Sequence, residues 1–407
     1  MKSCKQLAVL SLALLLLLCQ GCGTGEAIPT DNAYHSETDY QDWGKTGTDY
    51  FAETPEGISY DGLERLYLLS RNAGMPQLCC SRPECRHTWG EEGCSAKLDN
   101  LASNGIQYMN GQLYYLENNM ETNGQSLYRM DGNGDNRKLL WENLPHVDAF
   151  VCHRGQIYLY YAEHPTERTS ILKLGRLNPK KTEAEPEVIW QKEINENSSH
   201  LGRFISAHGN YLIFMDVNSQ DGGDCLYSMD LQSGEVYTCH FQKEALPQKF
   251  TIVGERVCVW VLAGEEYQLG SFSLKFEEEK YFQEYTRPFD PEYKANIQIA
   301  GDQKYLYWWE NRWDGASEEP LRILDAELQL VDTVDITAFR GSMDVYISPG
   351  DEGTVFLNRR EMNWGFYYFD KKDIGSGQIQ LKGLPLVCAT NDYTEPTDMP
   401  ADFSWSN

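Results

Sequence analysis

Short apolar and aromatic runs alternate with polar turns along most of this chain. One phrase recurs roughly every 48 residues: an apolar-aromatic strand, a polar loop, a second aromatic strand, and a turn rich in Asp, Asn and Gly. Its copies centre on residues 113–115, 157–158, 211–213, 257–259, 305–307 and 355–356, with a shorter first copy at 66–68. No window of about 12 residues sustains the apolar spacing of an amphipathic helix, so the pattern predicts an all-β protein.

The cleanest copy, residues 105–143, predicts four strands at 106–109, 113–117, 126–130 and 137–141. The turn at 131–136 consists of Asp, Asn and Gly, which tolerate the positive φ of tight hairpins. The same order recurs at 147–192, 201–244, 249–287, 295–338 and 343–382. Because no such unit buries both of its faces alone, we predict a β-propeller built from four-stranded antiparallel blades.

The first copy, at about 50–98, shows only two or three strands, at 57–60, 65–69 and 77–80. The apolar run 384–388 is placed to complete this blade and so close the ring. We therefore predict seven blades over residues 50–388 and a C-terminal tail over 389–407. The alternative is six blades, with the first segment lying outside the ring as a cap.

The chain begins with Lys2 and Lys5, followed by an apolar stretch at 7–18. As a helix this stretch reaches about 18 Å, short of the roughly 30 Å hydrocarbon core of a bilayer, and it therefore predicts a secretory signal. Gly21 and Cys22 resemble the lipobox of bacterial lipoproteins, in which the cysteine is acylated and becomes the first residue. This predicts a signal peptide at 1–21, a lipid such as palmitate on Cys22, and a flexible tether at 22–49. The alternative is an ordinary signal peptide with two chance cysteines.

The formal net charge of −26 makes nucleic acid and anionic lipid surfaces poor partners. The predicted contact with a membrane is through the lipid anchor, on the extracytoplasmic side. A solvated acidic surface is the simplest account of the charge.

Four cysteines and a histidine lie close together, at Cys79, Cys80, Cys85, His87 and Cys94. Cys80, Cys85, His87 and Cys94 offer three thiolates and an imidazole, which could close a tetrahedral structural zinc site. The spacing is not that of a familiar zinc knuckle, and an extracytoplasmic location also permits one or two disulfides. Both alternatives stay open.

This cluster, with its final Cys94-Ser95-Ala96, resembles the N-terminal part of a group of bacterial surface lipoproteins. The stretch 127–131, Leu-Tyr-Arg-Met-Asp, with Asn-Arg-Lys at 136–138, resembles the repeat of TolB-like and low-density-lipoprotein-receptor-type propellers. The resemblance spans nearly the whole chain after Cys22. It implies a propeller fold and an extracytoplasmic location. Because most proteins of this group have no assigned activity, the resemblance implies little about function.

Two further groups of residues are candidates. Cys225 and Cys239 are symmetric about Gln232, so a hairpin centred there would place them opposite each other and permit a disulfide; simple packing is the alternative. Aromatic and cationic residues in corresponding loops of neighbouring copies predict a platform for a sugar or a peptide, or else packing between blades; they are Trp309, Arg312, Trp313 and Trp364.

The sequence contains no Gly-x-Ser-x-Gly elbow, P-loop or His-Glu-x-x-His motif, so we predict that the protein is not an enzyme. We predict a lipid-anchored binding or scaffold module for a protein, a peptide or a glycan. The alternatives are a surface enzyme of the polysaccharide lyase or glycosidase type, and an accessory subunit of a transport or export complex.

Overall fold

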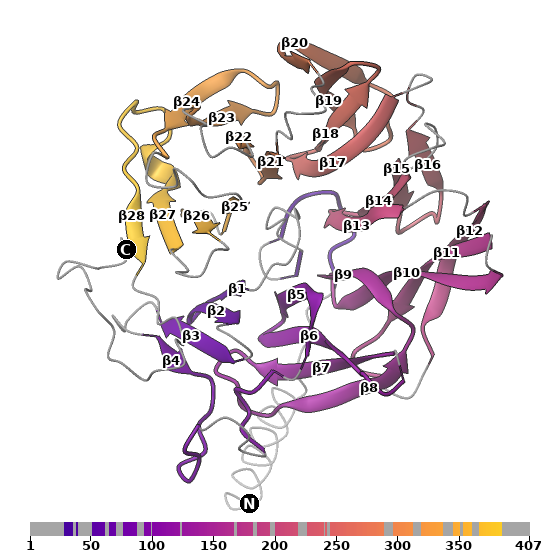
Figure 1. Ribbon diagram of the computed structural model, residues 1–407, viewed down its shortest axis with the longest axis vertical. Helices are drawn as coiled ribbons and strands as arrows, with labels where there is room; N and C mark the ends of the chain where they lie inside the picture. The colour runs from indigo at the N-terminus through magenta and orange to yellow at the C-terminus, as the bar shows by residue number, and fades with distance from the viewer. Residues whose placement is uncertain are drawn as a thin grey trace, which may run out of the picture.

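The computed structural model describes residues 28–35, 38–39, 51–61, 65–70, 76–87, 93–98, 100–122, 124–166, 169–181, 185–195, 200–218, 226–239, 241, 245–288, 296–311, 319–336, 345–350, 353–359 and 366–384. Within them, strands β1 to β28 form seven four-stranded antiparallel sheets, arranged as blades around a ring (Figure 1). The predicted seven-bladed propeller is therefore confirmed.

Each blade consists of four consecutive strands. Blade 1 is β1 (Phe51–Thr54), β2 (Gly57–Asp61), β3 (Leu66–Ser70) and β4 (Gln77–Leu78). Blade 2 is β5 (Leu101–Met109), β6 (Gln112–Asn118), β7 (Gln125–Asp131) and β8 (Lys138–Leu144). Blade 3 is β9 (Val147–His153), β10 (Gln156–Thr166), β11 (Thr169–Leu177) and β12 (Glu187–Asn195). Blade 4 is β13 (His200–His208), β14 (Tyr211–Asn218), β15 (Leu226–Asp230) and β16 (Val236–Cys239).

Blade 5 is β17 (Ala245–Val253), β18 (Arg256–Ala263), β19 (Glu266–Ser273) and β20 (Glu279–Pro288). Blade 6 is β21 (Asn296–Gly301), β22 (Tyr305–Asn311), β23 (Leu321–Asp325) and β24 (Leu330–Val334). Blade 7 is β25 (Val345–Ser348), β26 (Thr354–Arg359), β27 (Phe366–Asp370) and β28 (Lys382–Leu384). The described residues contain one short helical turn, η2 (Lys371–Asp373), and no helix that is long and apolar enough to cross a membrane.

The prediction that the first blade borrows a strand from the C-terminal end is wrong. β1 pairs with β2 and completes blade 1, while Leu384 ends β28 and pairs with Phe366 of β27 in blade 7. The sequence pattern missed β1 because it is only four residues long and joins β2 through the two-residue turn at Pro55 and Glu56. The remainder of the predicted closing run, 385–388, lies outside the described residues.

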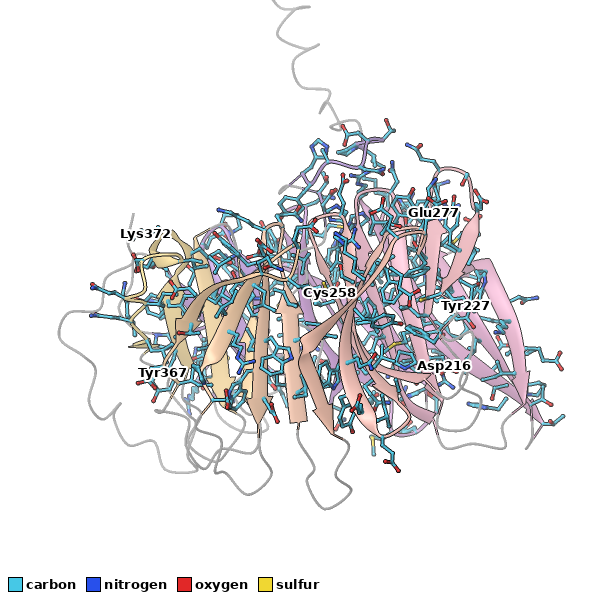
Figure 2. All side chains as sticks on the ribbon, turned by 90° about the horizontal axis from the view of Figure 1, so that it is seen from above. Asp216, Tyr227, Cys258, Glu277, Tyr367 and Lys372 are labelled. Carbon is cyan, nitrogen blue, oxygen red and sulfur yellow. The ribbon has the colours of Figure 1, made fainter. Side chains whose placement is uncertain are left out.

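The two faces of the ring carry different connections. We call the face with the turns between first and second strands, and between third and fourth strands, the hairpin face; the opposite one is the loop face. Figure 2 shows the ring edge-on, with Glu277 and Lys372 toward the hairpin face and with Asp216 and Tyr367 toward the loop face. In blade 3 the connection to the loop face is short, because Thr166 at the end of β10 opposes Thr169 at the start of β11.

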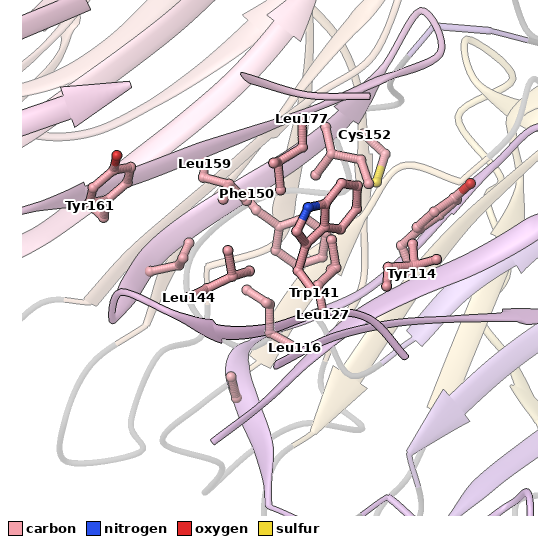
Figure 3. Packing of buried hydrophobic residues seen from close by; sticks show 14 of the residues in the cluster. Tyr114, Leu116, Leu127, Trp141, Leu144, Phe150, Cys152, Leu159, Tyr161 and Leu177 are labelled. Atoms are coloured by element: carbon pink, nitrogen blue, oxygen red, sulfur yellow. The ribbon is translucent and has the colours of Figure 1, made fainter. Parts of the chain in front are cut away.

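The core lies between adjacent blades. In the described residues, buried clusters join each consecutive pair from blades 1 and 2 to blades 6 and 7. Figure 3 shows the cluster between blades 2 and 3, where Leu116, Trp141, Phe150 and Leu159 interlock. Blades 2–6 each lie between two of these clusters, so their middle strands are apolar on both faces; this agrees with the repeat pattern of the sequence.

The register of blade 4 bears on the predicted disulfide. Cys239 pairs with Leu226, one residue beyond Cys225, because the turn between β15 and β16 is centred between Gln232 and Ser233. A shift of one residue places a side chain on the other face of a sheet, so this register differs by one position from the one on which the predicted disulfide was based, and the disulfide stays a prediction. Cys225 itself lies outside the described residues.

Candidate metal centre

The predicted metal ligands lie on the segment that leads from blade 1 to blade 2. This segment starts directly after β4, at the outer edge of the ring in Figure 1. Both of its ends are fixed to β3: the N–H of Cys79 donates to the carbonyl of Leu66 at 2.9 Å, and the N–H of Leu66 donates to the carbonyl of Ala96 at 2.7 Å. A loop that leaves and rejoins the same strand must double back, which brings its cysteines together.

Cys80, Cys85, His87 and Cys94 form a compact donor set, which we call the cysteine cluster. Their ligand atoms all lie within 4.8 Å of one another, and Cys94 Sγ is 3.7 Å from His87 Nδ1. A zinc ion with tetrahedral bonds would place sulfur and nitrogen ligands about 3.6 Å apart and two sulfurs about 3.8 Å apart. The cluster therefore fits a zinc ion after a contraction of at most about 1 Å.

The cluster is held by its own turns. The N–H of Cys85 donates to the carbonyl of Arg82 at 3.1 Å, and the side chain of Arg82 reaches the carbonyl of Gly93 at 2.5 Å. Arg65 donates to the carbonyl of His87, whose φ of 54° is in the left-handed region. The backbone on both sides of the donor set, at Gly93 and at His87, is thus held by the side chains of Arg82 and Arg65, which are not ligands.

The thiols of the cluster are electrostatically unequal. Burial raises the pKa of Cys80, but hydrogen bonds from the Ser95 hydroxyl and the Arg82 N–H outweigh it and lower the pKa to about 7. Burial raises the pKa of Cys85 to about 12. One thiol is therefore ready to ionise, and the charge of a bound divalent cation would favour ionisation of the others.

The four cysteines of this segment, at positions 79, 80, 85 and 94, are not linked by disulfides in the structure. Cys79 is not part of the donor set: it is buried, and burial together with Asp135 raises its pKa to about 12. It lies under the β7–β8 turn of blade 2, where a Cβ on Gly134 would be 2.0 Å from the Cys79 carbonyl oxygen. Only glycine fits there, so this turn and the segment pack as one unit.

Further contacts tie the segment to blade 2. Arg137 donates to the carbonyl of Lys97 at 2.5 Å and to Glu117 at 2.7 Å, and the hydroxyl of Ser81 donates to Asp135. The cysteine cluster therefore lies where blade 1, with its two-residue outer strand β4, meets blade 2. A metal ion there would fix this junction and would leave no open coordination position for catalysis.

The sequence analysis missed a second site, on the hairpin face. Residues 28–35 and 38–39, which we call the strap, belong to the stretch predicted as a tether and lie against the first turns of blades 3 and 4. The centre of the contact is Arg154, 4% exposed, paired with Asp39, 1% exposed. Its guanidinium donates to Asp39 Oδ1 at 2.9 Å and Oδ2 at 3.0 Å, to Asn210 Oδ1 at 2.7 Å, and to the carbonyls of Pro29 (3.0 Å), Asp31 (2.8 Å) and Ala33 (3.1 Å).

Blade 4 completes the clamp around the strap. Asn210 donates to the carbonyl of Thr30 at 2.7 Å, and a Cβ on Gly209 would be 2.7 Å from the carbonyl oxygen of Asn32. The buried His153 beside the clamp contacts the carbonyl of Gly209 at 2.8 Å, and burial lowers the pKa of His153 to about 4. Arg154 is therefore not opposed by a second positive charge near neutral pH.

One signal in the sequence could have revealed the clamp. Arg154 has a φ of 47°, at a turn position where blades 2, 4 and 5 use Asn110, Gly209 and Gly254. The left-handed conformation costs a residue with a side chain roughly 1–2 kcal/mol, less for Asn, so an arginine at such a turn indicates that its side chain has a specific partner.

The structure places one residue of the predicted aromatic platform, Trp309, in the core. Trp309 is 4% exposed and packs in the core between blades 6 and 7, while its neighbour Trp308 is fully buried on the other side, between blades 5 and 6. Trp309 therefore does not form an open surface, and the packing alternative holds at this position. Arg312, Trp313, Trp364 and the predicted lipid site Cys22 lie outside the described residues.

Known proteins show the same fold at low sequence identity. An oligogalacturonate lyase in complex with manganese has a TM-score of 0.53 at 11% identity, covering 82% of this chain and 96% of that one. A prolyl endopeptidase has a TM-score of 0.52 at 12% identity, covering 86% of this chain and 50% of that one. The propeller domain of the Trilobed protease from Pyrococcus furiosus has a TM-score of 0.47 at 12% identity, covering 89% of this chain and all of that one.

This chain thus spans half of the prolyl endopeptidase and 36% of the tricorn protease, another structure that it resembles at 9% identity and a TM-score of 0.47. No family model matches the sequence, and no curated protein matches it. At these identities the likeness is one of fold: a β-propeller of the kind found in the propeller domains of peptidases and in a lyase.

Proposed function

We propose that this protein is a lipid-anchored binding or scaffold module, held on the extracytoplasmic side of a membrane by Cys22, which presents its loop face to a protein, a peptide or a glycan. The observation that supports this most is the position of the strap. It lies on the hairpin face, so the N-terminal side of the propeller is opposite to the face on which the connections between second and third strands open, among them residues 219–225 and 312–320. Variable loops on a rigid scaffold are where binding commonly occurs.

Replacement of the predicted lipid site tests the anchor. Cys22→Ala should move the protein from the membrane fraction to the soluble fraction, because acyl chains contribute roughly 0.8 kcal/mol for each buried methylene and the described residues include no membrane-spanning helix. Cys19→Ala is the matched control, since Cys19 lies in the part that cleavage removes. Cys22→Ala protein that stays with the membrane would contradict the anchor.

The binding surface is tested on the loop face. Replacing Arg312, Trp313 and Trp364 by Ala in the full chain should weaken binding of a glycan or peptide selected on arrays at least about tenfold, because aromatic and arginine side chains dominate contact energies. Lys372→Ala on the hairpin face is the control. Unchanged binding of the triple variant would remove these residues from the binding surface.

We also propose that the cysteine cluster holds one structural zinc ion. The donor set of three thiols and an imidazole supports zinc over magnesium or calcium, which prefer oxygen ligands. Elemental analysis of the purified protein should find close to one zinc per chain, and less than a tenth of that after Cys80→Ser with Cys94→Ser. Cys79→Ala, which alters the neighbouring thiol outside the donor set, should retain the metal. If the cysteines of the cluster were oxidised and the protein contained no zinc, the disulfide alternative would be supported instead.

A surface lyase is the second candidate, because the oligogalacturonate lyase is covered almost completely by this propeller. The lyase candidate would be supported if the protein cleaved oligogalacturonate only after manganese was added. This cleavage should also persist when zinc is removed from the cysteine cluster.

A further inference from the structure

The strap changes the effective length of the connection between the lipid and the propeller. Cys22 and Phe51, where β1 begins, are 29 residues apart, a stretch that could extend to about 100 Å. The strap, however, begins at Ile28 and is bound to the propeller from the carbonyl of the next residue, Pro29, and Cys22 and Ile28 are only six residues apart. This limits the distance between their Cα atoms to about 20 Å.

We propose that the Arg154 clamp acts as an orientation device, which holds the hairpin face toward the membrane and within about 20 Å of the acylated Cys22, so that the loop face points away. The inference rests on the proposed lipid anchor and adds to it the height and the orientation of the propeller. The hairpin face thus lies nearest the lipid surface, to which only the acyl chains bind, and the loop face is left for the ligand.

The chemistry of the clamp favours a persistent attachment. The five N–H groups of one guanidinium are shared among six acceptors, which are three strap carbonyls, both oxygens of the Asp39 carboxylate and Asn210 Oδ1. Both charged side chains are almost completely buried. The N–H of Arg154 also donates to the carbonyl of Thr38 at 2.7 Å. If the ion pair broke while either group stayed buried, an uncompensated charge would remain in the protein at a high cost in free energy. The strap is therefore expected either to stay bound or to detach as a whole.

The strap also covers the middle of the ring from one side. Figure 1 shows the indigo segment crossing the centre of the ring near β9 and β13, and Figure 2 shows it on the hairpin face.

Two variants release the strap without disturbing the blades. Arg154→Asn removes the guanidinium and recreates the Asn-Gly turn that blade 2 uses at Asn110 and Gly111, so the hairpin is expected to fold. Asp39→Ala alters only the strap. The matched control is Arg176→Gln in blade 3, which breaks an exposed ion pair with Glu187.

Energy transfer from the protein to lipid headgroups measures the orientation. A fluorophore is placed at Lys372 on the hairpin face or at Met120 on the loop face, both exposed, in the full acylated chain in vesicles that carry headgroup-labelled acceptors. Wild type and Arg176→Gln should show clearly stronger transfer from position 372 than from position 120. In Arg154→Asn and Asp39→Ala this difference should shrink at least twofold, since about 100 Å of chain then permits many orientations.

Hydrogen exchange gives a readout that does not depend on the lipid. In detergent, the amides of Thr38 and Asp39, which donate to the carbonyl of His35, should exchange at least about tenfold faster in both release variants than in wild type. Equal transfer from the two positions in wild type, or a difference that survives both variants, would overturn the proposal. Protein that does not associate with the vesicles would instead refute the lipid anchor, and the exchange measurement would still show whether the clamp exists.

Discussion

Removal of zinc from the cysteine cluster is expected to destabilise the junction between blades 1 and 2. The free energy of unfolding should fall by about 4 kcal/mol if free zinc in the holo sample is about a thousand times its dissociation constant. The loss is expected at this junction because β4 is only two residues long. The segment after β4 is fixed to β3 and to the Gly134 turn by few backbone contacts. Without the ion, three buried or half-buried thiols and an imidazole would have no common partner.

Urea denaturation with and without a zinc chelator measures this loss, and hydrogen exchange locates it. Faster exchange should be confined to residues 79–87, 93–98 and the neighbouring strands β3 and β7, with blades 4 and 5 unchanged. Cys80→Ser should reproduce the effect of the chelator and should not respond to it further. A chelator that removes zinc but leaves the denaturation midpoint and the exchange of this segment unchanged would show that the ion has no structural role.

Trp309→Ala is expected to lower the free energy of unfolding by about 3–5 kcal/mol. The indole is 4% exposed and packs with Tyr307, Leu321 and Ile347 in the core shared by blades 6 and 7. Its truncation would leave a large cavity that neighbouring strands cannot fill, because each is fixed in its own sheet. The shift of the urea midpoint at constant slope measures the loss.

Trp309→Phe is the matched control. It keeps an aromatic ring in the cluster and removes an indole N–H that has no hydrogen-bond acceptor among the described residues, so its cost should be clearly smaller. If Trp309→Ala left stability unchanged and abolished ligand binding, the indole would belong to a binding surface, contrary to its position in the structure.

Most of the fold could be predicted from the sequence. The four strands predicted in the cleanest copy correspond to β5–β8, and the other predicted copies coincide with blades 3–7 to within a few residues. Strands and tight turns follow local rules, since a strand alternates its side chains over a few residues and a turn needs Asp, Asn or Gly at particular positions. The gathering of the cysteine cluster could also be predicted, because its four ligands lie within a short stretch of chain.

The errors arose where contacts cross between distant segments. The sequence could not show that Trp309 faces blade 7. β22 is buried on both faces, so polar and apolar residues do not alternate along it and do not distinguish one face from the other. It assigned the closing strand to 384–388 because β1 is too short to give a periodic signal. The register of Cys239 is set by the centre of one turn, and the sequence pattern placed this centre at Gln232, half a residue from its position in the structure.

The repeating unit, the number of its strands and blades, and the donor set that could hold a metal could be predicted, because they depend on residues close together along the chain. The position of the strap on the hairpin face could be known only from the folded protein, where Arg154 meets an aspartate 115 positions earlier. The energy of a buried ion pair depends on surroundings that exist only in the folded ring, and no local pattern of residues contains them.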